Sequence, residues 1–129
     1  MSAIVDSEQR KLFIEADVRL RTLQEMGWTQ WLGVQPGGRL AIYVDGIHYD
    51  FVVDECEPRI PPGEQGKAEL ITLSEALLET DTRVGSVVEL KGGATLLGHA
   101  RIDSMARVWI ERDRNNEKGY RISRGPVPL

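Results

Sequence analysis

Residues 39–54 read RLAIYVDGIHYDFVVD, two runs of β-forming side chains on either side of Asp45-Gly46. Asp-Gly accepts the positive φ angles of a two-residue hairpin turn, so the stretch predicts two antiparallel strands, at 39–45 and 47–54. The sequence on both sides contains further strand and turn signals, which together predict a mainly β protein.

On the N-terminal side, residues 12–23 (LFIEADVRLRTL) alternate apolar and charged side chains, the period of two expected of a half-buried strand. The residues ahead of them, including Ile4 and Val5, are expected to form a short helix or a loose arm. Residues 24–38 interrupt the alternation with four glycines and one proline, which predicts a long structured loop.

On the C-terminal side, residues 56–66 contain three prolines and two glycines, which exclude helix and central strand and predict a loop. One helical turn is expected to begin at Ser74. The further strands are expected at 67–73, 86–93, 94–102, 106–113 and 120–123. A polar loop at 114–119 joins the last two strands, and the proline-containing tail should be extended.

Short strands separated by glycine and proline turns are typical of small barrels and sandwiches, and closure of a barrel removes exposed sheet edges. We therefore predict a small antiparallel six-stranded closed β-barrel with a C-terminal β-hairpin extension. The 129 residues suit a single domain, 1–129, with the barrel at 12–103 and the hairpin and tail at 104–129. Another small barrel or sandwich is the alternative, and residues 104–129 could seal the barrel or pair with a second chain.

Three short motifs follow one another along the chain. Pro62-Gly63-Glu64 lies in the loop before the strand expected at 67–73, Gly92-Gly93 forms the turn between the strands expected at 86–93 and 94–102, and Leu97-Gly98-His99-Ala100 lies in the second of these. Their order and spacing resemble the C-terminal β-barrel of elongation factor Tu, and residues 13–23 resemble the opening strand of that family. The resemblance spans roughly residues 12–103 and implies a standalone, divergent barrel of this type.

In that family the barrel contacts the GTPase domain, the T-arm of aminoacyl-tRNA and the exchange factor, so the resemblance implies a binding surface. Gln35 and Ala94 stand where the family has arginines, and the loss of two cations weakens contacts with an RNA backbone. The chain also contains no GxxxxGK[ST] phosphate loop, which excludes GTP hydrolysis by that mechanism.

The charge balance points away from nucleic acid. Twenty acidic residues against 16 basic ones give a net charge of -4, which disfavours general attraction to phosphates or to anionic lipid. Arginines nevertheless collect near the C-terminus, and Arg112, Arg114 and Arg121 are the candidates for contact with RNA. A solvated face of alternating charges is the other interpretation.

The candidate partner surface centres on Trp28 and Trp31, three residues apart in a glycine-bearing loop. Tryptophan is enriched at binding hot spots, so this pair, with Gln35 and Arg39 beyond it, predicts a protein-binding anchor. The other interpretation is that the two indoles plug one end of the barrel.

Little in the sequence predicts catalysis. His48 and His99 have no metal-ligand spacing and are expected to be structural or surface residues. Cys56 lies between two glutamates, which would raise its pKa and suppress a thiolate nucleophile. The acidic residues of the hairpin are expected to be turn formers and solvated side chains: Asp45, Asp50 and Asp54. We therefore expect no enzyme, no cofactor and no metal.

A basic-then-apolar leader and a run of about 18 apolar residues are both absent from the sequence, which predicts a cytoplasmic protein without membrane contact. We expect a protein-interaction module whose partner is another protein. One version is an immunity or antitoxin-type binder that meets a basic toxin by complementary charge. The alternative is an RNA-binding accessory domain related to translation, and a third reading, a hydrolase, requires a deep polar pocket.

Overall fold

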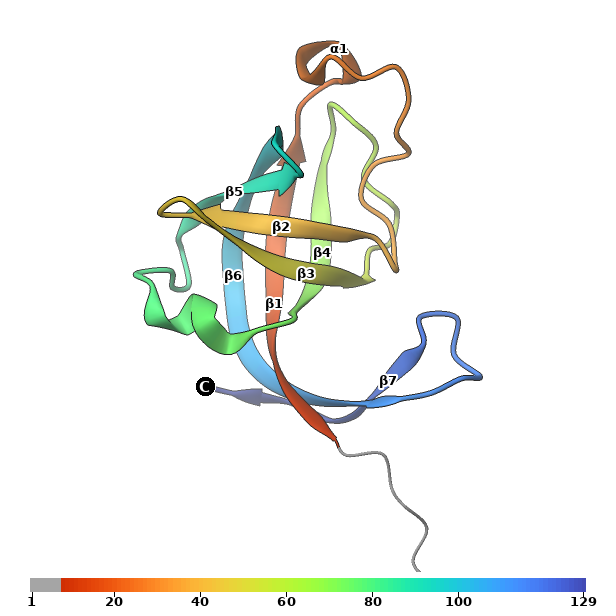
Figure 1. Cartoon of the computed structure of the whole chain (residues 1–129), viewed down its shortest axis with the longest axis vertical. Coiled ribbons are helices and arrows are strands. Elements are labelled where there is room, and N and C mark those ends of the chain that lie inside the picture. The colour runs from red at the N-terminus through yellow and green to blue at the C-terminus, as the bar shows by residue number, and fades with distance from the viewer. Residues whose placement is uncertain (1–7) are drawn as a thin grey trace, which may run out of the picture.

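The computed structural model describes residues 8–129 of the chain, and Figure 1 shows the arrangement of its elements. The strands are β1 (Gln9–Leu20), β2 (Arg39–Val44), β3 (Ile47–Glu55), β4 (Gln65–Thr72), β5 (Val87–Gly92), β6 (Thr95–Arg112) and β7 (Tyr120–Pro128). Two short helical elements interrupt them, α1 (Leu23–Met26) and the 3-10 turn η1 (Glu75–Glu79).

Hydrogen bonding between the strands closes a ring. The sheet order is β1–β4–β3–β2–β5–β6, every pairing is antiparallel, and β6 returns to pair with β1. Strand β7 pairs with β6 outside this ring. The predicted fold class is confirmed as a mainly β antiparallel fold, in which one seven-stranded sheet has ring-like pairing and carries a C-terminal hairpin.

The inside of the ring is a packed apolar core. Every second side chain of β1 points into it, and Ile14 and Val18 are almost completely buried. The other ring strands contribute Ile42, Phe51, Leu70, Leu90, Leu97 and Ile102, each at most 1% exposed. Burial of each large apolar side chain stabilises the fold by roughly 1.5–3 kcal/mol, so this core holds the ring together.

The β2–β3 hairpin is confirmed. Asp45 and Gly46 have φ angles of 52° and 81°, and Val44 pairs with Ile47 across the turn. Both positive angles match the turn type that Asp-Gly favours between twisted antiparallel strands.

The first strand is displaced from its predicted position. Strand β1 begins at Gln9 because its first residues pair with β6, so the prediction of a helix or arm is wrong for residues 9–11. The rest of that prediction falls on residues 1–7, which lie outside the described residues. The strand ends at Leu20, because Thr22 and Glu25 form a reciprocal capping box that starts α1.

Strand β4 also begins earlier than predicted. Gln65 and Gly66 pair with β1, so the proline-rich loop ends two residues before the expected position. The helical turn at Ser74 is confirmed, because the Ser74 hydroxyl accepts a hydrogen bond from the Ala76 amide at 3.1 Å and caps η1.

The separate strands predicted at 94–102 and 106–113 are one continuous strand, β6, so the expected break is wrong. A register shift at Asp103 absorbs one extra residue opposite β1, and pairing resumes at Ser104. Gly98 permits the close approach of the two strands, since a Cβ at this position would collide with the Arg19 carbonyl. Strand β6 therefore belongs both to the ring and to the C-terminal hairpin, as its long curve in Figure 1 shows.

The C-terminal hairpin covers part of the outer wall of the ring. A second apolar cluster forms there from Phe13, Val52, Ile71 and Val108, and Ile110, Tyr120 and Ile122 pack against it. The tail is extended as predicted, because it continues β7 to Pro128. Residues 104–129 thus pack on the ring of their own chain.

Candidate functional site

The two tryptophans of the predicted partner surface lie together at one end of the ring. Their rings meet edge to face, with centroids 5.5 Å apart and an interplanar angle of 88°. Both are half-buried and pack against the main core, and Trp28 also lies against Gly92. This packing is what a plug of the ring end requires, while their role as a binding anchor stays a prediction.

Gln35 and Arg39, the other two residues of the predicted partner surface, are both exposed, and their role in binding stays a prediction. Gln35 is exposed in the loop before β2, and Arg39 is exposed at the start of β2, where it pairs with Val52 on the outer wall. Arg39 instead lines a hollow together with Arg112, which the sequence had assigned to the predicted RNA surface. The structure therefore brings together two residues that were predicted to belong to different sites.

The other candidate RNA residues have different environments. Arg114 is exposed in the loop between β6 and β7, whereas Arg121 forms an ion pair with Glu111 on the neighbouring strand. Arg124 pairs with Glu8 at 2.9 Å, and its guanidinium lies over Trp109. The basic character of the hairpin is thus partly neutralised by its own neighbours.

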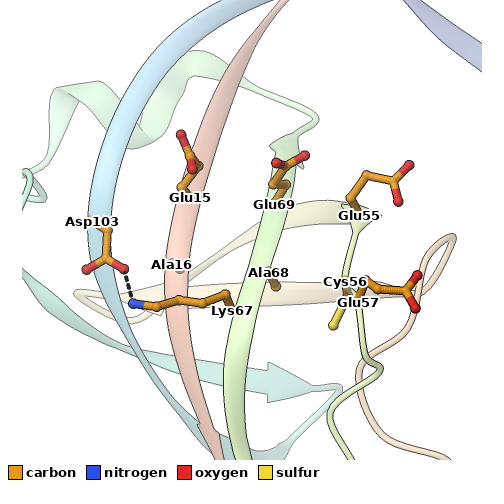
Figure 2. A pocket seen from close by; sticks show the side chains of 9 residues that line it. All are labelled: Glu15, Ala16, Glu55, Cys56, Glu57, Lys67, Ala68, Glu69 and Asp103. Atoms are coloured by element: carbon orange, nitrogen blue, oxygen red, sulfur yellow. Dashed lines mark hydrogen bonds and ion pairs between the residues drawn. The ribbon is translucent and has the colours of Figure 1, made fainter.

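A second hollow, of about 430 Å³, lies on the outer wall where β6, β1, β4 and the end of β3 run side by side. Figure 2 shows its charged side chains, which are Glu15, Glu55, Glu57, Lys67, Glu69 and Asp103. The remaining lining residues, Ala16, Cys56 and Ala68, are buried. We call this the acidic hollow, because five carboxylates face one ammonium group.

Strand register explains how the acidic hollow forms. Glu15 on β1 is directly opposite Glu69 on β4, and Glu69 is directly opposite Glu55 on β3. The three carboxylates therefore stand in one row across three neighbouring strands, as Figure 2 shows. We call this row the acidic rung. Like charges directly opposite each other in a sheet destabilise the pairing, so the row works against the fold.

The charges of the acidic rung are only partly compensated. Glu15 accepts a hydrogen bond from the Ser104 hydroxyl at 2.9 Å, and Glu55 pairs with Lys118 at 3.1 Å. Glu69 forms no ion pair or side-chain hydrogen bond with any described residue. Burial raises the pKa of Glu69, and the nearby carboxylates of Asp54, Glu15 and Glu55 raise it further.

In the next row of outward side chains, acidic groups lie beside basic ones. Asp17 on β1 lies between Lys67 on β4 and Arg101 on β6, at 3.1 and 3.3 Å. Asp103 completes the group, with contacts of 2.8 Å to Lys67 and 2.9 Å to Arg101. We call these four residues the paired rung. Hydrogen bonds from Gln65 and Lys67 lower the pKa of Asp17, so its charge is stabilised.

The hairpin is anchored beside the acidic hollow by a buried ionic cluster. The Lys118 ammonium donates to the Asp54 carboxylate at 3.0 Å, and the Tyr120 hydroxyl donates to the same oxygen at 2.8 Å. Asp54 is only 5% exposed, so the prediction of a solvated hairpin carboxylate is wrong for this residue. Asp54 lies at the register shift of β3, which turns its side chain toward the hairpin. There the carboxylate accepts hydrogen bonds from Lys118 and Tyr120.

The other polar candidates have ordinary surroundings. His48 contacts the Gly93 carbonyl at 3.1 Å and packs edge to face on Tyr43, while His99 is exposed. Burial raises the pKa of the Cys56 thiol, and Glu57 adds to the shift. Among residues 8–129, no group of three His, Cys, Asp or Glu side chains is arranged to hold a metal ion.

The acidic rung was not predicted from the sequence. Glu15 was visible as part of the polar face of the first strand, but its opposite neighbours were not, because the order of strands around the ring was unknown. A period-two pattern identifies which side chains point outward and not which of them meet.

The chain matches no known family model and no curated protein. In the part of the chain that the structure describes, neither helical element has the length or hydropathy to cross a bilayer.

Proposed function

We propose that this chain is a non-catalytic protein-interaction module whose acidic rung receives a basic segment of a partner protein. The observation that supports the proposal is the row formed by Glu15, Glu69 and Glu55, in which the central carboxylate forms no ion pair with any described residue. A row of like charges opposes folding, and positions that break such a local rule are often the functional ones. A partner's Lys or Arg would supply the direct ion pair that Glu69 does not form within the described chain.

The surroundings of the rung favour a side chain over a larger ligand. Lys118 of the hairpin already pairs with Glu55 at one end of the row, which illustrates how an ammonium group fits beside it. The hollow is partly open to solvent, and burial raises the pKa of its thiol at Cys56, which does not favour a paired nucleophile and base. These features support binding without chemistry.

In the fuller form of the proposal, the ring is a divergent relative of the elongation factor Tu C-terminal barrel, and the module is an immunity or antitoxin-type binder of a basic toxin. The motifs of residues 61–102 support the first part. The acidic hollow and the net charge of -4 support the second, because complementary charge speeds association and selects partners. The alternative, an RNA-binding accessory domain, is weakened by the pairing of Arg121 with Glu111.

The test compares two double variants that change net charge equally. In Glu15→Gln/Glu69→Gln the rung loses two charges, whereas Glu64→Gln/Glu79→Gln removes two exposed carboxylates that do not line the hollow. Binding of a labelled hexapeptide of alternating Lys and Ala is measured by fluorescence anisotropy at low and moderate salt. We expect the rung variant to bind about tenfold more weakly than the control, equivalent to about 1.4 kcal/mol.

The same two variants then serve as baits for affinity capture from cell extract. A protein retained by the wild type and the control, and lost by the rung variant, would be the partner. Equal binding of the hexapeptide by both variants would contradict the proposal, because attraction would then follow net charge alone. The rung substitutions should raise stability, so a loss of binding would not be due to misfolding.

A further inference from the structure

The hollow that Arg39 and Arg112 line, whose charge is opposite to that of the acidic hollow, lies between the ring and the C-terminal hairpin. Its volume is about 630 Å³, and Arg39 lines it from the ring, at the start of β2. The hairpin side is formed by Ile110, Glu111, Arg112, Lys118 and Tyr120. We call it the hairpin hollow. It exists only because β6 leaves the ring and folds back over the outer wall.

Some charged side chains of the hairpin hollow have an ion-pair partner, and others have none among the described residues. Lys118 is held by Asp54 and Glu55, and Glu111 is held by Arg121. Arg39 and Arg112 form no ion pair or hydrogen bond with any side chain in the described part of the chain. Two arginines from distant segments therefore line one hollow, and neither has an ion-pair partner among the described residues.

One wall of the hollow is apolar and fixed in place. Ile110 and Tyr120 pack on the outer cluster of the ring, and the Tyr120 hydroxyl is tied to Asp54 at 2.8 Å. A ligand with an anionic head and a short apolar stem would thus place its head near Arg39 and Arg112 and its stem against this wall. Guanidinium groups bind carboxylates through paired, charge-assisted hydrogen bonds, which makes a Glu or Asp side chain a good chemical match.

We propose that the hairpin hollow binds a carboxylate side chain from an acidic segment of a protein partner, through Arg39 and Arg112. This goes beyond the proposed function, because the site has the opposite charge and does not depend on the acidic rung. The Lys118–Glu55 ion pair separates the two hollows, so one partner surface bearing both a basic and an acidic residue would reach both.

A peptide carboxylate fits the surroundings better than a nucleic acid does. Three glutamates are exposed around the same end of the ring: Glu55, Glu57 and Glu117. Two of them, Glu55 and Glu117, line a separate hollow between the hairpin loop and the ring. A chain of phosphates continuing beyond Arg39 and Arg112 would meet these carboxylates. A single acidic side chain would avoid them.

The test is a nuclear magnetic resonance titration of the full chain that follows the Arg side-chain NH signals and the amides of Gly119 and Tyr120. The probes are an acetylated hexapeptide with one Glu among five alanines, its Gln counterpart, and hexauridylate. We expect the Glu peptide to bind saturably, with shifts at Arg39, Arg112 and Gly119, and the Gln peptide to cause none.

Two matched variants complete the test. Arg39→Gln/Arg112→Gln should weaken binding of the Glu peptide about tenfold. The control Arg19→Gln/Arg83→Gln, which changes net charge equally at exposed positions outside the hollow, should bind like the wild type. Equal weakening by both variants, absence of saturable binding, or tighter binding of hexauridylate at the same signals would each overturn the proposal. None of these results depends on whether the acidic rung binds a basic segment.

Discussion

The acidic rung and the paired rung are neighbouring rows on the same outer wall, and they share β1 and β4. In the paired rung, Asp17 stands between Lys67 and Arg101, so each charge faces an opposite one. The acidic rung lies two residues away, toward the start of β1 and the end of β4, and there Glu15 is opposite Glu69. The two rows share these strands, yet the charges of one support the fold and those of the other oppose it, and this contrast is the basis of the proposed binding role of the acidic rung.

The contrast extends to the protonation of the two rows. Hydrogen bonds and nearby cations lower the pKa values of Asp17 and Asp103, whereas burial and neighbouring carboxylates raise the pKa of Glu69. A lowered pKa means that the charged form stabilises the folded state, and a raised one means that it destabilises it. The two rows should therefore respond to mutation and to pH in opposite directions.

The largest expected effect concerns the anchor beside the acidic rung. Lys118→Met leaves the buried Asp54 without its cation and Glu55 without its partner, so we expect a loss of about 3 kcal/mol in the free energy of unfolding. Tyr120→Phe removes only one donor to Asp54 and should cost about 1 kcal/mol. Urea unfolding measures both. A Lys118→Met variant no less stable than Tyr120→Phe would show that the cluster is not held by its cation.

The second prediction converts the acidic rung into a copy of the paired one. Glu69→Lys places a cation between Glu15 and Glu55, and we expect the free energy of unfolding to rise by about 1 kcal/mol while binding of the basic hexapeptide is lost. Glu64→Lys, at an exposed position outside the rung, should change stability by less than about 0.5 kcal/mol. Equal gains in the free energy of unfolding of the two variants would show that the rung behaves like the rest of the exposed surface.

The third prediction uses pH. The pKa of Glu69 is raised above its ordinary value of 4.5, so the folded state binds its proton more readily than the unfolded state does. Wild-type stability should therefore fall as pH rises through the window between these two pKa values. Glu69→Gln removes this penalty, and we expect a gain of about 0.5 kcal/mol at pH 7 that disappears below about pH 4. Thermal unfolding across that range measures it, and a gain independent of pH would contradict the electrostatic origin.

The smallest expected effect is in the paired rung. Asp17→Asn should lower the free energy of unfolding by about 0.5 kcal/mol at pH 7, because exposed ion pairs contribute little. The pKa of Asp17 is lowered below 3.8, so its contribution is present above that value and is lost as pH falls through the folded-state pKa. The loss should also shrink in high salt. Asp81→Asn, at an exposed position outside both rungs, provides the control for denaturant unfolding.

Much of the fold could be predicted because its signals are local. The Asp45-Gly46 turn, the strands around it and the helical turn at Ser74 follow from the conformational preferences of a few adjacent residues. The break predicted within β6 was wrong for the opposite reason. Pairing with β1 resumes at Ser104 after the register shift at Asp103 and so continues the strand, and that pairing is a long-range contact.

The candidate sites depended on contacts of the same long-range kind. Trp28, Trp31, Arg39 and Arg112 were recognised as residue types suited to binding. A plug of the barrel end was the alternative interpretation of the tryptophans, and it agrees with their packing on the core, but the sequence could not indicate that the two arginines share a hollow. The acidic rung carried no local signal, because its three glutamates come from three separate strands.

The amino-acid sequence by itself determined the strand content, the hairpin turn, the net negative charge and the alternation of inward and outward side chains. These properties arise from interactions between residues close together in the chain. Only the tertiary structure decided which outward charges meet, since strand order and register are set by the packing of the whole ring and a shift of one residue would turn every side chain to the other face. The acidic rung and the hairpin hollow are products of that register.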